Sequence, residues 1–367
     1  MKLFKSLLVA PAALGLLAPM SATANEITVN DFIPVEEISN ISPLLAGGEG
    51  LVDDHSHDGG FSETTSASFS IDAAIGAIDG DTTSEATTVD YQFNIGLSTS
   101  FTGEDSLDIA LDSGSTAAST ADNPMAFDTG AGLSVDGVTY SFPLGGLSMV
   151  VGVDTDLSTT FTGACSYSAF TDYMGDCGTG NSIGSGGNGF TAAGSYAFDS
   201  GFSLAGSISG TADGADTATN AKGLLTKEGT DSYGIEAAYT ADAWGVSVAY
   251  VYDDNATSAE TTTWGVNGTY SFDLADVSVG FETEETSGTE KTGYFVGVTF
   301  PEVGPGSVSV GAATSANYAS SATEYMIYEA AYTYPVNDGL TITPGVFIEE
   351  KSGDDLTGVI VKSSFSF

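Results

Sequence analysis

Arginine is absent from this chain of 367 residues, and basic residues are few altogether. Seven lysines stand against 49 Asp plus Glu, which gives a formal net charge of −42. So acidic a chain cannot neutralise phosphates, and ordinary nucleic-acid binding is excluded. Charged residues make up 15% of the chain, compared with roughly 25% in soluble domains. Since helix-forming residues are also scarce, a soluble helical or α/β enzyme is not expected. The 41% of hydrophobic residues nevertheless exceeds what a disordered acidic tail would contain.

Histidine is also scarce: His55 and His57 are the only two, and both lie in the acidic stretch 53–58. Two imidazoles beside carboxylates can bind a divalent transition metal, although short clusters of this kind are also found without any function. With no histidine elsewhere, a Ser-His-Asp triad cannot be assembled further along the chain. No phosphate-binding loop or zinc motif occurs, so we expect neither enzymatic activity nor a cofactor.

The first 24 residues have the features of a secretory signal peptide. Lys2 and Lys5 form a basic start, residues 7–17 are apolar, and Ala22-Thr23-Ala24 is a small-residue cleavage site. We therefore expect residues 1–24 to be a signal peptide of an exported protein, followed by a short periplasmic segment over residues 25–64.

Cysteine is limited to Cys165 and Cys177, twelve positions apart in the exported part of the chain. In an oxidising compartment a disulfide between them is expected rather than a redox or metal pair. No mature segment is an apolar run long enough for a membrane-spanning helix.

What the chain has instead, after residue 65, is a pattern of period two. One face of each repeat is apolar, with aromatics at its ends, and the other face is small or polar. A clear example has these apolar residues on one face: Trp244, Val246, Val248, Tyr250 and Tyr252. Such alternation is typical of strands that cross a bilayer, and a soluble β-sandwich is the alternative.

The links between these strands alternate in length. Short links alternate with longer polar ones, of which 154–189 is the longest and 283–291 is another. Outer-membrane barrels have this asymmetry, with short periplasmic turns and longer outer loops. We count about sixteen strands, and predict an all-β fold in which residues 65–367 form a transmembrane antiparallel β-barrel. The last strand, with Val359, Val361, Phe365 and Phe367 alternating on one face, is predicted to close the barrel against the first.

Three stretches carry a resemblance to a known family: the leader over residues 1–19, the segment Tyr140-Ser-Phe-Pro-Leu-Gly145, and the closing hairpin. The hairpin match comprises Glu329, Tyr332, Tyr334, Val336, Asp338, Leu340, Ile342-Thr-Pro-Gly-Val-Phe347 and Ser363-Ser-Phe-Ser-Phe367. Together they resemble the outer-membrane porins of cyanobacteria, a group related to carbohydrate-selective porins and often labelled iron-uptake porins. The chain departs from that family in lacking a surface-layer-homology module and in having no arginine to face the lumen. The resemblance implies a homotrimer.

A barrel of about sixteen strands is wide enough to enclose an aqueous channel. Its inward faces are predicted to be mostly Gly, Ser, Ala and Thr. The charged residues expected in the lumen are Asp108, Glu236, Glu329 and Lys362.

Residues 154–189 form the third outer loop, which in sixteen-stranded porins folds inward to make the constriction. We predict a negative constriction formed by Asp154, Asp156, Asp172 and Asp176. The alternatives are that the disulfide only protects an exposed loop, and that most acids decorate solvated loop tips, where divalent cations could bridge them to lipid head groups.

These observations predict an outer-membrane porin for passive diffusion of small hydrophilic solutes. The acidic loop predicts a preference for cations, and the expected solutes include inorganic ions such as iron. The expected partners are outer-membrane lipid, the barrel-assembly machinery and small solutes or ions. The alternative is a non-conducting acidic surface barrel that acts as an adhesin or structural protein.

Overall fold

The computed structural model describes residues 65–80, 86–115, 124–125, 127, 130, 132–211, 223–226, 229–255, 259–314 and 324–367. The expected signal peptide, the segment 25–64 and the pair His55 and His57 lie outside the described residues. Within the described residues, no helix is both long and apolar enough to cross a membrane.

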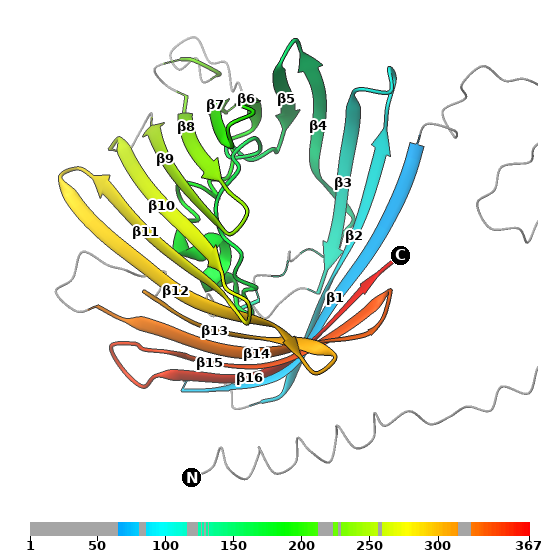
Figure 1. Ribbon diagram of the computed structural model, residues 1–367, viewed down its shortest axis with the longest axis vertical. Coiled ribbons are helices and arrows are strands. Elements are labelled where there is room, and N and C mark those ends of the chain that lie inside the picture. The colour runs from blue at the N-terminus through cyan, green and yellow to red at the C-terminus, as the bar shows by residue number, and fades with distance from the viewer. Residues whose placement is uncertain are drawn as a thin grey trace, which may run out of the picture. The chain divides into compact units, whose positions relative to one another are not determined.

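Sixteen strands form one closed antiparallel ring, which confirms the predicted fold class. Each strand pairs with its neighbours in the chain, and β1 pairs with β16 to complete the ring (Figure 1). The strands are β1 (Thr65–Asp79), β2 (Thr88–Thr99), β3 (Ser106–Gly114), β4 (Ser134–Leu144), β5 (Leu147–Val153), β6 (Phe190–Ala197), β7 (Phe202–Gly210), β8 (Asp231–Thr240), β9 (Trp244–Asp254), β10 (Thr261–Ser271), β11 (Asp276–Thr286), β12 (Thr289–Val303), β13 (Gly306–Thr314), β14 (Met326–Asn337), β15 (Leu340–Glu349) and β16 (Leu356–Ser366).

The seam between β1 and β16 closes the barrel as the C-terminal pattern predicted. Val361 lies opposite Ile75, and Phe365 lies opposite Ile71. Phe367, just beyond the end of β16, continues the pairing with Phe69 of β1. The backbone N–H of each donates to the carbonyl of the other at 3.0 Å, and the two rings stack with centroids 5.6 Å apart. The closed ring leaves no sheet edge unpaired.

The outward face of the barrel is apolar. In β9, Trp244 and Val248 are 44% and 39% exposed, whereas Ser247 and Ala249 on the inward face are nearly inaccessible. Aromatic rings gather at both ends of the strands, as in the pairs Tyr239–Trp244 at 5.0 Å and Tyr250–Trp264 at 4.6 Å between centroids. A single closed ring with an apolar exterior excludes the alternative of two sheets packed face to face.

The links divide the barrel into a short-turn end and a long-loop end, with one exception to the sequence prediction. Residues 283–291 were expected to be a longer loop, but β11 and β12 continue to a two-residue turn. Ser287 and Gly288 both have positive φ, 55° and 75°, which suits a tight hairpin turn. The cross-strand pair Glu284 and Lys291 extends the ladder into the polar stretch.

The interior of the barrel is partly filled by residues 154–189, called the inner loop from here on. It begins after β5, contains the 3-10 segment η3 (Asp172–Gly178), and is drawn in green inside the ring of strands (Figure 1). Phe170 and Met174 of the inner loop join a buried apolar cluster with Phe295 and Phe347 from the strands. Phe127, from the link between β3 and β4, belongs to the same cluster. The third outer loop therefore folds inward as predicted.

Candidate functional site

The inner loop is seated on the inward faces of β8–β15, which we call the covered wall. Glycines of this wall make room for the loop, at Gly265, Gly280, Gly297, Gly311 and Gly345. A Cβ added to Gly280 would lie 1.8 Å from the carbonyl oxygen of Cys177, and one at Gly345 would lie 2.5 Å from the ring of Phe170. The glycines on the inward face of this wall thus leave the space in which the inner loop packs.

Glu236 of β8 holds the first limb of the inner loop. Its two carboxylate oxygens accept the backbone N–H groups of Thr162 and Gly163 at 2.6 and 2.7 Å. The hydroxyl of Ser247 on β9 donates a third hydrogen bond at 2.5 Å. The residue is 3% exposed, so its charge is satisfied by these donors rather than by water.

Glu329 of β14 holds the middle of the inner loop in the same manner. Its oxygens accept the backbone N–H groups of Phe170 and Thr171, both at 2.8 Å. The hydroxyls of Thr171 and Tyr167 donate two further bonds at 2.6 and 2.9 Å. Glu329 is also 3% exposed. Glu236 and Glu329, two of the residues expected in the lumen, lie on inward faces of the strands, and the inner loop covers both.

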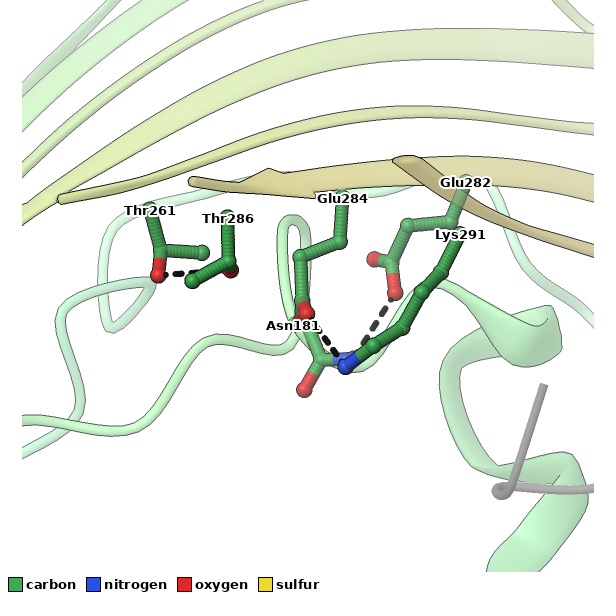
Figure 2. Close-up of polar contacts among 6 residues, drawn as sticks. All are labelled: Asn181, Thr261, Glu282, Glu284, Thr286 and Lys291. Carbon is green, nitrogen blue, oxygen red and sulfur yellow. Dashed lines mark hydrogen bonds and ion pairs between the residues drawn. The ribbon is translucent and has the colours of Figure 1, made fainter. Parts of the chain in front are cut away.

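Side chains of β10 and β11 bind the last limb of the inner loop, and one of them also binds Ala164 in the first limb. Glu282 accepts a hydrogen bond from the amide of Asn181 at 3.0 Å (Figure 2). It accepts a second one from the hydroxyl of Ser182 at 2.7 Å. Asn267 accepts the N–H of Ala164 at 2.7 Å and donates to the hydroxyl of Thr179 at 3.2 Å. Polar residues in mid-strand therefore bind the inner loop from Thr162 to Ser182.

The predicted disulfide between Cys165 and Cys177 is present, with Cα atoms 5.8 Å apart. Cys165 comes shortly after the residues that contact Glu236, and Cys177 lies in η3, shortly after the residues that contact Glu329. The disulfide therefore links these two parts of the inner loop. Cys177 is fully buried against the covered wall. A covalent bridge at this place restricts the shapes that the loop can adopt.

The inward faces of β2–β4 form the opposite side of the site, called the bare wall. Between this wall and the start of the inner loop lies a cavity of 370 Å³. Its acidic lining residues are Asp108 and Asp136 from the wall and Asp154 and Asp156 from the loop. Among the described residues that line it, none is basic. The arrangement therefore presents carboxylates of one sign from both sides.

Asp136 was not among the residues predicted from the sequence. Simple alternation along β4 places it on the outward face with Val138 and Tyr140. The pairing of β3 with β4 shifts register between Ala110 and Leu111, opposite Asp136. A bulge of this kind re-aims one side chain, and here it brings an aspartate into the cavity. No feature of the sequence marks that position as a bulge.

The other loop acids extend the negative region. Burial raises the pKa of Asp156 above its usual value, and the charges of Asp136 and Asp176 raise it further. Burial likewise raises the pKa of Asp176, with a second contribution from Asp172. Both residues are exposed, yet the surrounding protein removes part of the hydration of their carboxylates. Asp156, Asp172 and Asp176 thus form a series of interacting negative charges, and Asp154 lines the cavity together with Asp156.

The lysines in the described part of the chain are each paired with an acid. Lys362 lies 3.6 Å from Asp72 at the β1–β16 seam, and Lys351 lies 3.3 Å from Glu349. Lys291 contacts Glu284 at 2.8 Å near the long-loop end (Figure 2). Within the described residues no group of three His, Cys, Asp or Glu side chains is arranged to hold a metal ion.

Comparison with known proteins gives the same architecture. The sequence matches no protein-family model and no curated protein. An engineered variant of the Rhodobacter blastica porin is similar in structure, with a TM-score of 0.53 and 16% identity over 83% of this chain and 100% of that chain. A loop-deletion variant of OmpT, an outer membrane protein of Vibrio cholerae, has a TM-score of 0.59 and 10% identity over 83% of this chain and 99% of the other.

At this level of identity the comparisons establish the fold. A closed antiparallel barrel with an apolar exterior is the form in which β-structure crosses a bilayer, because each of the sixteen strands pairs with a neighbour on both sides and no edge is left open. The chain is accordingly a barrel of the outer membrane.

Proposed function

We propose that the chain forms a water-filled channel for the passive diffusion of small hydrophilic solutes, with a preference for cations. Barrels of sixteen strands are wide enough to enclose an aqueous passage. The inner loop occupies the side of the covered wall, and the bare wall across from it is polar. The passage runs between them, along the acidic cavity.

The observation that carries the cation preference is the single sign of charge on both sides of the cavity. Asp108 and Asp136 on the bare wall face Asp154 and Asp156 on the inner loop. A narrow passage with low-dielectric walls concentrates such a field, which raises the local concentration of cations and repels anions. Since salt screens exposed charges, the preference decreases as ionic strength rises.

Inorganic ions such as iron fit a passage of this charge, and the resemblance to cyanobacterial porins supports them as physiological solutes. The resemblance also supports a homotrimer in the outer membrane. Assembly there would require the barrel-assembly machinery and contact with outer-membrane lipid along the apolar exterior.

The experiment is single-channel recording of the purified protein in planar bilayers under a potassium chloride gradient. We expect ohmic current steps with a reversal potential shifted towards that of potassium, and a shift that becomes smaller when both solutions are made more concentrated. Electrical silence would contradict the channel and favour a non-conducting surface barrel. Steps with a reversal potential at zero or towards chloride would contradict the cation preference alone.

A further inference from the structure

We propose that Glu236 and Glu329 are positioning residues that hold the inner loop in one place and so fix the cross-section of the passage. This inference rests on the proposed function, but its structural part can be tested without conduction. The two residues come from strands six apart in the ring, β8 and β14, and bind different parts of one loop.

The two contacts have the same construction. In each, the N–H groups of two consecutive loop residues point at the two oxygens of one glutamate. Thr162 and Gly163 do so for Glu236, and Phe170 and Thr171 for Glu329. Gly163 has a φ of 60°, a left-handed conformation of the kind that helps adjacent N–H groups converge on an anion. We call these two contacts the carboxylate clamps.

The clamps require a carboxylate, because a backbone N–H can only donate. Every oxygen of Glu236 and Glu329 faces one such N–H. A glutamine would therefore place its amide NH₂ group against one of the N–H donors, and that donor would be left buried without an acceptor. Although glutamine has nearly the same size and shape as glutamate, this substitution would thus release one loop residue at each clamp.

The groups that face the two carboxylates are donors. Around Glu329 they are the hydroxyls of Tyr167 and Thr171 together with the two N–H groups. Around Glu236 the additional donor is the hydroxyl of Ser247. Hydrogen bonds to a buried ionised group are stronger than those between neutral groups, and four of them converge on Glu329.

The matched control is Glu350, which uses the same chemistry away from the inner loop. Its carboxylate accepts the backbone N–H of Met326 at 3.1 Å and the hydroxyl of Tyr328 at 3.4 Å, next to β14 at the long-loop end. E350Q therefore removes one negative charge and disturbs one carboxylate contact without altering a clamp.

The test measures amide hydrogen exchange by mass spectrometry for the full chain folded in detergent micelles or lipid nanodiscs. In E329Q, exchange at Phe170 and Thr171 should become roughly tenfold faster or more, and in E236Q the same should hold at Thr162 and Gly163. E350Q should leave all four unchanged. If E329Q and E236Q match E350Q at these amides, the clamps do not hold the loop.

Current recordings extend the test to the passage itself. E329Q and E236Q should increase open-channel noise severalfold and add brief transitions between conductance levels, because a released loop moves in the lumen. T171A removes one hydroxyl donor at Glu329 without changing any charge, and should raise the noise by a smaller factor. If the variants only shift the reversal potential while noise and conductance stay as in the wild type, the glutamates act as charges and the positioning role is excluded.

The two proposals fail separately in this design. A silent wild-type protein would contradict the proposed function, while the exchange rates would still decide whether the clamps exist. The variants are compared only after heat-dependent migration in gels shows a folded barrel. If neither glutamine variant folds, T171A decides alone, because the lost hydroxyl and the N–H of residue 171 bond the same oxygen of Glu329. Faster exchange at residue 171 supports the clamp, and unchanged exchange contradicts it.

Discussion

The covered wall and the bare wall are built from similar residue types, yet the inner loop gives them opposite roles. On the covered wall, the glycines receive the loop, and the acids Glu236 and Glu329 are buried under it. On the bare wall, Gly96 has open space beyond one serine side chain, and Asp108 and Asp136 line a cavity. The role of an inward residue therefore depends on whether the inner loop covers it, which strand alternation alone does not reveal.

The largest effect is expected from adding a methyl group to the covered wall. In G280A the new Cβ would lie 1.8 Å from the carbonyl oxygen of Cys177, which is backbone and cannot turn aside. We expect the free energy of unfolding to fall by about 1–3 kcal/mol, the usual cost of overpacking. Urea titration of the barrel in lipid, followed by tryptophan fluorescence, measures the change.

G96A on the bare wall is the control. Its Cβ would meet only the hydroxyl of Ser68, at 2.6 Å, and that hydroxyl can rotate away. We expect a change within about 0.5 kcal/mol. Equal destabilisation by G280A and G96A would show that the two walls do not differ in the way described.

Removing charge from the bare wall should change selectivity while leaving stability nearly intact. In the double variant D108N/D136N, both acidic groups that the wall contributes to the cavity become neutral. We expect the cation-to-anion permeability ratio to fall by roughly two- to fivefold, because unit charges interact by about 1 kcal/mol at 4 Å in water. Reversal potentials in a dilute potassium chloride gradient measure the ratio.

D172N/D176N is the comparison within the inner loop. The charge of Asp172 contributes to the raised pKa of Asp176, and that of Asp176 to the raised pKa of Asp156, so this pair belongs to the same negative region. We expect a smaller decrease in the permeability ratio than for the wall pair. A ratio that D172N/D176N leaves unchanged would remove these two acids from the constriction.

The cation preference should also decrease at mildly acidic pH. Since the pKa values of Asp156 and Asp176 are raised, these carboxylates take up protons at a higher pH than ordinary aspartates, whose pKa is about 3.9. As pH falls from neutral, part of the negative charge is therefore lost early. Reversal potentials recorded across a pH series should show this early decline, and D156N/D176N should lack it. An identical pH profile in that variant would contradict the assignment.

The smallest effect is expected at the ion pair of the β11–β12 hairpin. Lys291 lies 2.8 Å from Glu284, with its side chain 38% exposed. Exposed pairs of this kind contribute about 0.2–1 kcal/mol, so K291M should lower the unfolding free energy by no more than that. A loss as large as that of G280A would show that this hairpin, and not the seat of the loop, controls stability.

Most of the architecture could be predicted from the sequence because a membrane barrel repeats one rule. Alternation of period two, as in Trp244 to Tyr252, marks each strand, and the order of short and long links marks each turn. The closing strand and the disulfide followed from local patterns at Val359 to Phe367 and at Cys165 and Cys177. The inward course of residues 154–189 followed from the position of that loop in the chain.

What could not be predicted depends on contacts between distant residues. The roles of Glu236 and Glu329 require knowing which loop atoms lie above them, 73 and 159 positions away in the chain for Gly163 and Phe170. Asp136 depends on a register shift, and Phe127 depends on packing in the buried apolar cluster that residues of the inner loop also join. The polar stretch 283–291 was expected to be a loop because its cross-strand pairing is invisible along one strand.

The seam between β1 and β16 has a consequence for how such a molecule is made. Residues 70–79 find their partners among residues 357–366, so almost the whole described chain separates the two halves of this one ladder. Contacts so distant in sequence form slowly. Until the last hairpin arrives, β1 offers a row of free amides and carbonyls to any passing polypeptide. Any factor that binds this edge of β1 during assembly must therefore dissociate when β16 pairs with it, so closure of the barrel is coupled to dissociation of that factor.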